Sequence, residues 1–236
     1  MAETWSCHVI EHDFFDAGVR RLVLSKPSLA TDFFAGQYLQ LVISERRFPF
    51  SIANAPGGET LELHIKPTPG SSDSALVEGY LDQRPSSIDI TYPEGACFIS
   101  KTPDRPLILI AAATGITQMK SICDWVMQQS ESQSLSIFWG TLTPEELYLS
   151  GYFEALALRH SNVRYYPVIS EPHDHWVGRK GLVVDAVIDE CEAIEEAEIF
   201  ISGSPAMVYG TLDRLLTVGV LEARVHADVF DYAPRR

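Results

Sequence analysis

The sequence predicts an antiparallel β-barrel followed by a parallel α/β domain, an architecture of the α/β plus β class. The N-terminal part contains short runs rich in Val, Ile, Leu and aromatic residues, separated by turn residues. After residue 106, apolar strands alternate with helical segments, as in a parallel sheet. Between the two parts, "KTPDRP" at 101–106 combines prolines with alternating charges and cannot continue a strand or a helix. We therefore expect one domain at 1–102 and a second at 103–236.

The N-terminal domain contains six predicted strands. They alternate partially between apolar and polar residues and are bounded by turn residues such as Gly36 and "APGGE" at 55–59. One short helix is expected near 73–81. Six strands with a single helix favour a small closed or nearly closed barrel. The strands are expected at 6–11, 19–25, 37–43, 50–54, 61–66 and 87–92.

The C-terminal domain alternates strands with helices. Ile116, Met119, Ile122 and Val126 recur at helical spacing, so we expect them to form the buried face of a helix. This order of elements implies a parallel sheet with helices on both faces. The strands are expected at 107–112, 135–140, 163–169, 198–202 and 224–229. The helices are expected near 116–129, 145–159, 181–190 and 205–217.

Charge and composition argue against several classes of function. The chain of 236 residues has a formal net charge of −14, which disfavours nucleic acid and anionic membrane surfaces, because both attract a basic protein face. Its apolar runs are shorter than the roughly 20 residues that cross a bilayer. The start, "MAETWSCHVIEHDFF", lacks the pattern of a secretory signal. We therefore expect a cytoplasmic protein that binds neither nucleic acid nor membranes.

The cysteines and histidines predict no metal site. Four cysteines lie far apart in the chain and form no metal or iron–sulfur spacing. The two histidines of "PHDHW" at 172–176 have no further ligand nearby in sequence, which favours a solvated loop.

A strand that turns sharply into a helix is the most informative stretch. In "LILIAAATGIT" at 107–117, a buried strand runs directly into Thr114 and Gly115. The first N–H groups of the following helix then lie at the edge of the sheet, where ligands bind in α/β proteins. The stretch is neither the G-x-G-x-x-G pattern nor a P-loop. A plain β–α turn with small residues for packing is an equally good interpretation of this stretch alone.

Two further stretches point to the same region. In "IFISGSPAMV" at 199–208, a second buried strand runs into Ser202 and Gly203, and a helix begins near Pro205. Two such turns in one parallel sheet favour a shared ligand. In the barrel, "FPFSIANAP" at 48–56 offers a flat apolar platform with one hydroxyl, although taken alone it is better explained as an ordinary strand.

Together these motifs resemble the ferredoxin–NADP reductase superfamily, and within it the short bacterial NAD(P)H:flavin oxidoreductases, including those that supply bacterial luciferase. The resemblance covers nearly the whole chain. Its motifs stand in the family's order: "AGQYLQL", "FPFSIANAP", "LELHI", "LILIAAATGIT", "IFWG", "EELY", "ISGSPAMV" and "HADVFDY". The resemblance implies an N-terminal flavin-binding β-barrel and a C-terminal NAD(P)H-binding α/β domain.

The resemblance also implies which residues meet the two cofactors. It places the Ser51 hydroxyl near flavin N5, as a catalytic group that modulates the reaction. Thr114 and Gly115 match a turn between flavin and nicotinamide, and Phe230 matches an aromatic residue beside the flavin. The implied cofactor-binding residues are Phe48, Pro49, Phe50, Ser51, Leu63, His64, Ile65, Thr114, Gly115, Ser202, Gly203, Pro205, Met207 and Phe230.

The chain departs from the family's pattern at two places near the nucleotide. Ala112 and Ala113 replace two glycines of a G-G-T-G loop, and Gln118 stands where related enzymes often have proline. After "WG", Thr141 and Leu142 occupy positions near which many relatives carry an arginine. Because a guanidinium binds a 2′-phosphate in a fork, its absence there favours NADH over NADPH, unless Arg159, Arg164 or Arg179 reaches the nucleotide from elsewhere.

A third departure concerns the flavin. Phe48 takes the place of an arginine that contacts the ribityl or phosphate part of the flavin in the superfamily, and Arg46 and Arg47 lie earlier in the chain. A phenyl ring cannot pair with a phosphate. We therefore expect riboflavin, FMN or FAD to bind as a dissociable substrate, unless Arg47 restores the contact.

The leading hypothesis is NAD(P)H-dependent reduction of free flavin by hydride transfer to flavin N5, for which the cofactors carry the chemistry and the protein aligns them. The reduced flavin would supply a separate flavin-dependent oxygenase or luciferase. One alternative is a reductase that retains its flavin and passes electrons to a protein partner. A second alternative is a non-catalytic nucleotide-binding module.

Overall fold

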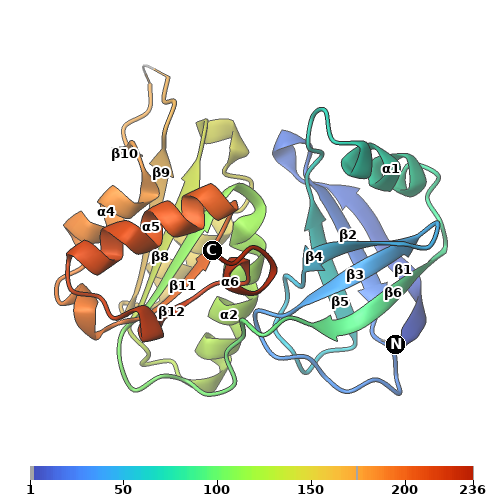
Figure 1. Ribbon diagram of the computed structural model, residues 1–236, viewed down its shortest axis with the longest axis horizontal. Coiled ribbons are helices and arrows are strands. Elements are labelled where there is room, and N and C mark those ends of the chain that lie inside the picture. The colour runs from blue at the N-terminus through green and yellow to red at the C-terminus, as the bar shows by residue number, and fades with distance from the viewer. Residues whose placement is uncertain (1–2, 174, 236) are drawn as a thin grey trace.

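The computed structural model describes residues 3–173 and 175–235. Two domains lie side by side, an N-terminal barrel and a C-terminal α/β domain (Figure 1), so both parts of the predicted fold are confirmed. The chain crosses from one to the other between Glu94 and Leu107. The predicted division after residue 102 falls within this segment.

The barrel is a single antiparallel sheet with the strand order β4-β3-β6-β1-β2-β5. Alternation along β3 and β4 turns Leu39, Leu41 and Phe48 into its interior, where all three are buried. The N–H of Ala53, just after β4, donates to the carbonyl of Glu62 in β5 at 2.7 Å, so the two edge strands meet and the barrel is nearly closed. The strands are β1 (Thr4–Phe14), β2 (Arg20–Ser25), β3 (Tyr38–Ile43), β4 (Arg46–Ser51), β5 (Thr60–Ile65) and β6 (Ser87–Glu94).

One helix, α1 (Ser72–Leu81), covers part of the barrel (Figure 1). The Ser71 hydroxyl accepts a hydrogen bond from the N–H of Ser74 and so caps the helix. The buried Arg20 donates to Glu78 at 2.8 Å and to Asp82 at 2.7 Å. These charge-assisted bonds tie the helix to strand β2. A short turn of 3₁₀ helix, η1 (Asp16–Gly18), joins β1 to β2.

The fourth strand differs from the prediction of 50–54. It begins at Arg46 and ends at Ser51, after a two-residue turn in which Ser44 and Glu45 have φ of 50° and 64°. Positive φ at both positions is the geometry of a tight type I′ hairpin. The start of this strand is hard to recognise in the sequence, because its first two residues are the exposed, charged Arg46 and Arg47. An edge strand tolerates such residues, whereas a central strand would not.

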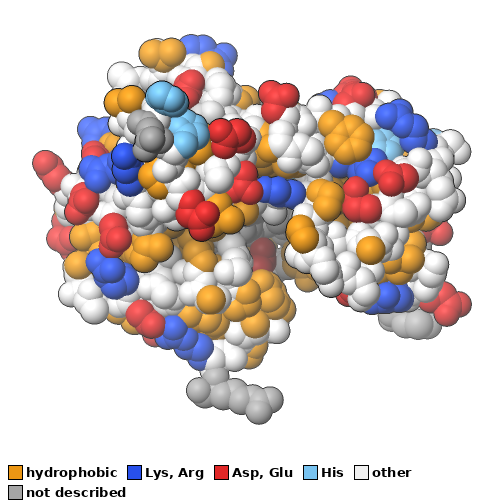
Figure 2. All heavy atoms as spheres, turned by 90° about the horizontal axis from the view of Figure 1, so that it is seen from above, with side chains coloured by type: hydrophobic (Ala, Val, Ile, Leu, Met, Phe, Trp, Pro, Cys, Tyr) orange, Lys and Arg blue, Asp and Glu red, His pale blue; other side chains and the backbone are white. Residues whose placement is uncertain are grey.

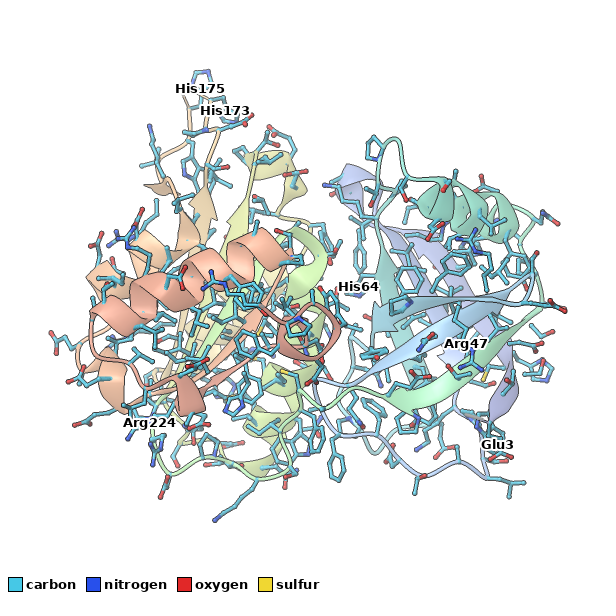
Figure 3. All side chains as sticks on the ribbon, viewed as in Figure 1. Glu3, Arg47, His64, His173, His175 and Arg224 are labelled. Atoms are coloured by element: carbon cyan, nitrogen blue, oxygen red, sulfur yellow. The ribbon has the colours of Figure 1, made fainter. Side chains whose placement is uncertain are left out.

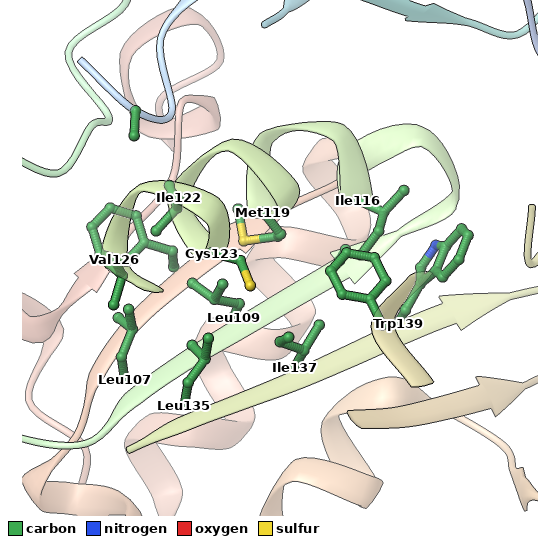
Figure 4. Packing of buried hydrophobic residues seen from close by; sticks show 14 of the residues in the cluster. Leu107, Leu109, Ile116, Met119, Ile122, Cys123, Val126, Leu135, Ile137 and Trp139 are labelled. Carbon is green, nitrogen blue, oxygen red and sulfur yellow. The ribbon is translucent and has the colours of Figure 1, made fainter. Parts of the chain in front are cut away.

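The α/β domain is a parallel sheet with the order β10-β9-β8-β7-β11-β12 and helices on both faces. Figure 4 shows α2 on the sheet, with Ile116, Met119, Ile122 and Val126 packed over β7 and β8; all four are fully buried, as predicted. The strands are β7 (Leu107–Ala112), β8 (Leu135–Thr141), β9 (Val163–Ile169), β10 (Arg179–Lys180), β11 (Glu198–Ser202) and β12 (Val225–His226). The helices are α2 (Ile116–Gln129), α3 (Ser150–Arg159), α4 (Val183–Glu190), α5 (Pro205–Thr217) and α6 (Val229–Tyr232).

Two predicted elements of this domain are shorter than expected, and the short strand β10 was not predicted. The predicted helix 145–159 is divided, because Thr143 and Glu146 close a capping box around the turn η3 (Pro144–Glu146) and Leu147 leaves the helical conformation. The predicted strand 224–229 ends at His226, because Asp228 has helical φ and ψ and opens α6. The remaining 3₁₀ turns are η2 (Ala113–Gly115), η4 (Ile194–Glu196) and η5 (Glu222–Arg224).

Among the described residues, no helix combines the length and the apolar character needed to cross a membrane.

Candidate active site at the domain junction

A cavity of about 390 Å³ lies where the barrel meets the α/β domain. The barrel contributes residues from β3 and β4, and the α/β domain contributes the end of β11 and the C-terminal segment. Its walls therefore come from parts of the chain that are far apart in sequence. The barrel side consists of Tyr38, Gln40, Pro49, Phe50 and Ser51. The opposite side consists of Ile201, Ser202, Gly203, Asp228, Val229 and Tyr232.

Strand alternation explains which residues of β4 reach this cavity. Pro49 pairs with Gln40 and Ser51 pairs with Tyr38 across the β3–β4 ladder, so these four residues share the outward face of the barrel. Phe50 points toward the barrel core but also borders the cavity. Phe48 belongs to the barrel core and does not line the cavity.

The three sequence-predicted residues of β5 lie elsewhere. Leu63 and Ile65 are buried in the barrel core. His64 lies at the junction of the domains (Figure 3), where Nδ1 is 3.2 Å from the Tyr148 hydroxyl and Nε2 is 2.8 Å from a Glu62 carboxylate oxygen. Burial lowers the pKa of His64 against the opposing effect of Glu62. This histidine therefore joins the two domains and does not line the cavity.

The Thr114–Gly115 turn packs directly against the second small-residue turn. A Cβ atom on Gly115 would lie 2.4 Å from the carbonyl oxygen of Ser202, a distance that no side chain can occupy. A Cβ atom on Gly203 would lie 2.9 Å from the Met207 sulfur and 3.2 Å from the Ala112 Cβ. The single glycine of the first turn is thus required by the close approach of the two turns. Thr114 and Gly115 line neither cavity. Gly115 instead packs against Ser202, which lines the junction cavity.

A second cavity of about 390 Å³ opens at the carboxyl ends of β7 and β8. Its walls are mostly small or apolar, including Ala112, Gly140 and Met207, and the N-terminal turns of α4 and α5 border it. Pro205 is the first residue of α5, and the Ser204 hydroxyl accepts a hydrogen bond from the Met207 N–H at 3.3 Å. The edge of a parallel sheet between helix N-termini is where α/β domains bind nucleotides.

Asp228 is a site residue that sequence reasoning missed. Asp228 lines the junction cavity, and its Oδ2 accepts a hydrogen bond from Gln118 Nε2 at 2.8 Å. Within the described part of the chain, its other oxygen is buried without a partner. Burial raises the pKa of Asp228 to about 6, although Gln118 and the Cys97 N–H favour the charged form. The sequence contains one indication of this residue, an acid within the apolar run "HADVF". A buried acid with a perturbed pKa is a candidate functional residue.

The C-terminal aromatic at the cavity is Tyr232, whereas Phe230 was predicted. Phe230 turns toward the α/β domain, where its ring lies 5.7 Å from that of Tyr209. Tyr232 lines the junction cavity and is largely exposed. Because α6 is a single turn, residues two apart face opposite ways, and the sequence motif alone could not decide which one meets the cavity.

An ion pair crosses the boundary between the domains near the site. Lys66, the residue after β5, pairs with Glu146 of η3, and Glu146 also accepts a hydrogen bond from the Leu142 N–H at 2.9 Å. Figure 2 shows this side of the molecule, where acidic and basic side chains are interspersed. The described residues contain no group of three or more metal-ligating side chains.

Comparisons with known proteins agree with this architecture. Residues 109–213 match the family described as the oxidoreductase NAD-binding domain. The chain is 32% identical over 188 residues to an NAD(P)H-flavin reductase of Vibrio harveyi, covering 77% of this chain and 79% of that protein. It is 29% identical over 234 residues to a probable flavin reductase of Photobacterium leiognathi, covering 97% and 99% of the two chains.

Among solved structures, the cytochrome P450 reductase GcoB of Amycolatopsis superposes with a TM-score of 0.85 at 25% identity, covering 97% of this chain and 70% of that one. A ferredoxin NADP⁺ reductase of Neisseria gonorrhoeae with bound FAD and NADP shares the fold, with a TM-score of 0.79 at 19% identity over 96% of this chain and 98% of that one. With the sequence relatives and the two adjoining cavities, these likenesses show that the chain belongs to the flavin reductases of the ferredoxin–NADP reductase superfamily, oxidoreductases that use a flavin and a pyridine nucleotide.

Proposed function

We propose that this protein uses NADH or NADPH to reduce free flavin and then releases the product. The observation that carries the proposal is the wall shared by the two cavities. Ser202 and Gly203 line the junction cavity, Ala112 and Met207 line the second cavity, and Gly203 lies against both of these residues. A nucleotide in the second cavity can therefore bring its nicotinamide to the edge of the junction cavity, where the flavin ring binds.

The residues of the junction cavity fit a flavin ring. Pro49 and Phe50 provide an apolar surface on β4, and Ser51 adds a hydroxyl at the end of the strand. When bound, the dihydronicotinamide transfers a hydride from its C4 to flavin N5, which oxidises the nucleotide and reduces the flavin. The protein holds the rings together and excludes water, and Ser51 contributes one hydrogen bond near the accepting nitrogen.

The surroundings of Phe48 support binding of the flavin as a dissociable substrate. Phe48 is buried in the barrel, and the Arg46 guanidinium stacks on its ring at 5.2 Å from the centroid. Arg46 also pairs with Asp73 in the first turn of α1. Arg46, the cation that stacks on Phe48, is therefore already paired with a carboxylate. This arrangement leaves little to hold a flavin phosphate on that face of β4.

The charges around the second cavity support a preference for NADH. Arg214 is the one basic residue among the described residues that line it, and it pairs with Asp185 at 2.9 Å. Glu146 lines the same cavity and would repel a 2′-phosphate. Arg159, Arg164 and Arg179 do not line this cavity, and Arg179 pairs with Asp189 and Glu190.

A reductase that retains its flavin and serves a protein partner is the second candidate. The likeness to a cytochrome P450 reductase favours it, because the name of that protein describes such a partner. The match covers 70% of that reductase, so part of its chain has no counterpart here. For the free-flavin reaction, the recipient would be a separate flavin-dependent oxygenase or luciferase.

Anaerobic assays of NADH and NADPH oxidation, with and without added riboflavin, FMN and FAD, test the proposal. We expect oxidation that requires added flavin and saturates in both substrates, from a protein that purifies nearly colourless. A yellow protein that oxidises the nucleotide only when an electron-accepting protein is added would support the second candidate. A folded preparation that reduces none of the three flavins would contradict the proposal.

A further inference from the structure

Gln118 connects three separate parts of the chain beside the junction cavity. It lies in the first turn of α2 and is 1% exposed. Its Nε2 donates to the Gly36 carbonyl at 2.8 Å and to Asp228 Oδ2 at 2.8 Å, with the Cys97 carbonyl at 3.3 Å. Gly36 belongs to the barrel, Cys97 to the connecting segment, and Asp228 to the C-terminal segment.

The chemistry of these contacts requires a side-chain donor. All three facing atoms are acceptors, so only the amide nitrogen of Gln118 can satisfy them. Its two hydrogens match the two short contacts, one to the barrel and one to Asp228. A proline at this position would have no side-chain donor and could make neither contact. The connection between the barrel and Asp228 therefore depends on the amide of Gln118.

The bond to Gln118 fixes the orientation of Asp228 relative to the cavity. Oδ2 accepts the bond from Gln118, while Oδ1 is buried without a partner among the described residues and lies close to Gly95. The neighbouring titratable groups add no positive charge that would hold the carboxylate otherwise. They are Cys97, Tyr38 of β3, Glu94 of β6, and Asp231 and Tyr232 of α6.

We propose that Gln118 is a positioning residue that holds the Asp228 carboxylate at the junction cavity and links its orientation to the docking of the barrel. The proposal rests on the proposed function in one respect, namely that the junction cavity receives the flavin. If the barrel moves away, the contact to Gly36 is lost and Gln118 is free to turn from Asp228. The acid is then correctly placed only when the two domains are closed on each other.

The test compares Gln118→Met with Ser121→Ala. Methionine keeps the length and apolar packing of the side chain but donates no hydrogen bond. Ser121 lies one turn further along α2 and is fully buried, and its hydroxyl donates to the Asn54 carbonyl of the barrel segment at 2.8 Å. Ser121→Ala therefore removes a contact between α2 and the barrel segment without touching Asp228, and it controls for loss of docking alone.

The primary measurement is the NMR titration of the Asp228 carboxyl carbon in the resting protein, assigned with Asp228→Asn. Because the Gln118 bond favours the carboxylate, its loss in Gln118→Met should raise the titration midpoint by about one pH unit, about tenfold in the ionisation equilibrium. Ser121→Ala should leave the midpoint unchanged. If Gln118→Met does not fold, Gln118→Leu, which also lacks a side-chain donor, carries the same expectation.

A midpoint that is unchanged in the Gln118 variant, or moved equally in Ser121→Ala, would overturn the proposal. The titration needs neither flavin nor turnover, so its result is separate from that of the flavin-reduction assay. In active protein, the inflection of the kcat/KM profile assigned to Asp228 should move in the same direction as the NMR midpoint. Loss of thermal stability without a moved inflection would show that Gln118 serves packing only.

Discussion

The two cavities are of similar size but are built in different ways. The junction cavity draws on side chains from both domains, including the ionisable Tyr38, Asp228 and Tyr232. The second cavity belongs to the α/β domain, and its walls are mostly backbone and small apolar side chains such as Ala112 and Gly140. The junction cavity therefore depends on the docking of the two domains and on a buried charge. The second cavity depends on close packing within the α/β domain.

Asp228→Asn should give the largest change in stability, because Asp228 at the junction cavity is a buried acid with a raised pKa. Its pKa is raised from 3.8 to about 6, so the folded state carries the cost of a buried carboxylate above pH 6, and this cost disappears as pH falls toward 3.8. A shift of about two units corresponds to about 3 kcal/mol. We expect Asp228→Asn to be more stable than the parent by about 2–3 kcal/mol at pH 8, and by much less at pH 4.

Urea unfolding of both proteins across this pH range measures the difference. Groups distant from Asp228 titrate alike in the two proteins, so the change in the difference reports on Asp228 together with its charged neighbour Asp231. A stability difference that is the same at pH 4 and pH 8 would show that the Asp228 carboxylate is not destabilised in the folded state.

Gly115→Ala tests the backbone packing on the nucleotide side. The added Cβ would fall 2.4 Å from the Ser202 carbonyl oxygen, so the two turns must separate. We expect a loss of about 1–3 kcal/mol of stability, as for other overpacked sites, and a raised KM for the nucleotide. Gly151→Ala is the matched control, because this glycine in the first turn of α3 has open space around its Cβ position. Equal effects in the two variants would argue against the tight contact between the turns.

Ser51→Ala concerns a single hydrogen bond on the flavin side. Such a bond contributes about 0.5–1.5 kcal/mol, so hydride transfer should slow by roughly 2- to 10-fold with the fold intact. Single-turnover flavin reduction measured by stopped flow separates this step from product release. Unchanged single-turnover rates would remove Ser51 from the proposed mechanism.

The two turns of small residues were easier to predict from the sequence than the residues at the end of the chain. A strand that ends in small residues before a helix has a local signature, so the turns at Thr114–Gly115 and Ser202–Gly203 could be found without coordinates. Their mutual contact could not, because it depends on the spacing of β7 and β11 in the sheet. Within the barrel, the alternation of apolar and polar residues predicted the fold class correctly. The start of β4 was not predicted, because its first residues are charged.

The C-terminal wall of the junction cavity was harder to predict, because its residues meet the barrel only after docking. Asp228 and Tyr232 come from the end of the chain, and a one-turn helix decides which of its side chains face the barrel. Gln118 was noticed only as a departure from the family's pattern. Its role as a donor to both the barrel and Asp228 follows from three-dimensional contacts, which have no signature in the local sequence.

The smallest expected effect is that of Arg47 on the affinity for FMN relative to riboflavin. Arg47 lies on the same outward face as Pro49 and Ser51, about 6–7 Å from Pro49 along the strand, and Figure 3 shows it out on the barrel. Arg46 is on the opposite face and is engaged by Asp73, so Arg47 is the remaining guanidinium that could meet a flavin phosphate.

An exposed pair between charged groups contributes about 0–1 kcal/mol, which is less than tenfold in affinity. We therefore expect dissociation constants for riboflavin and FMN within tenfold of each other, and little change in either for Arg47→Ala. Equilibrium titration by flavin fluorescence provides both constants. If FMN binds tenfold or more tightly than riboflavin and Arg47→Ala abolishes the difference, then Arg47 has replaced the arginine lost at Phe48, and the barrel side of the site selects the phosphate after all.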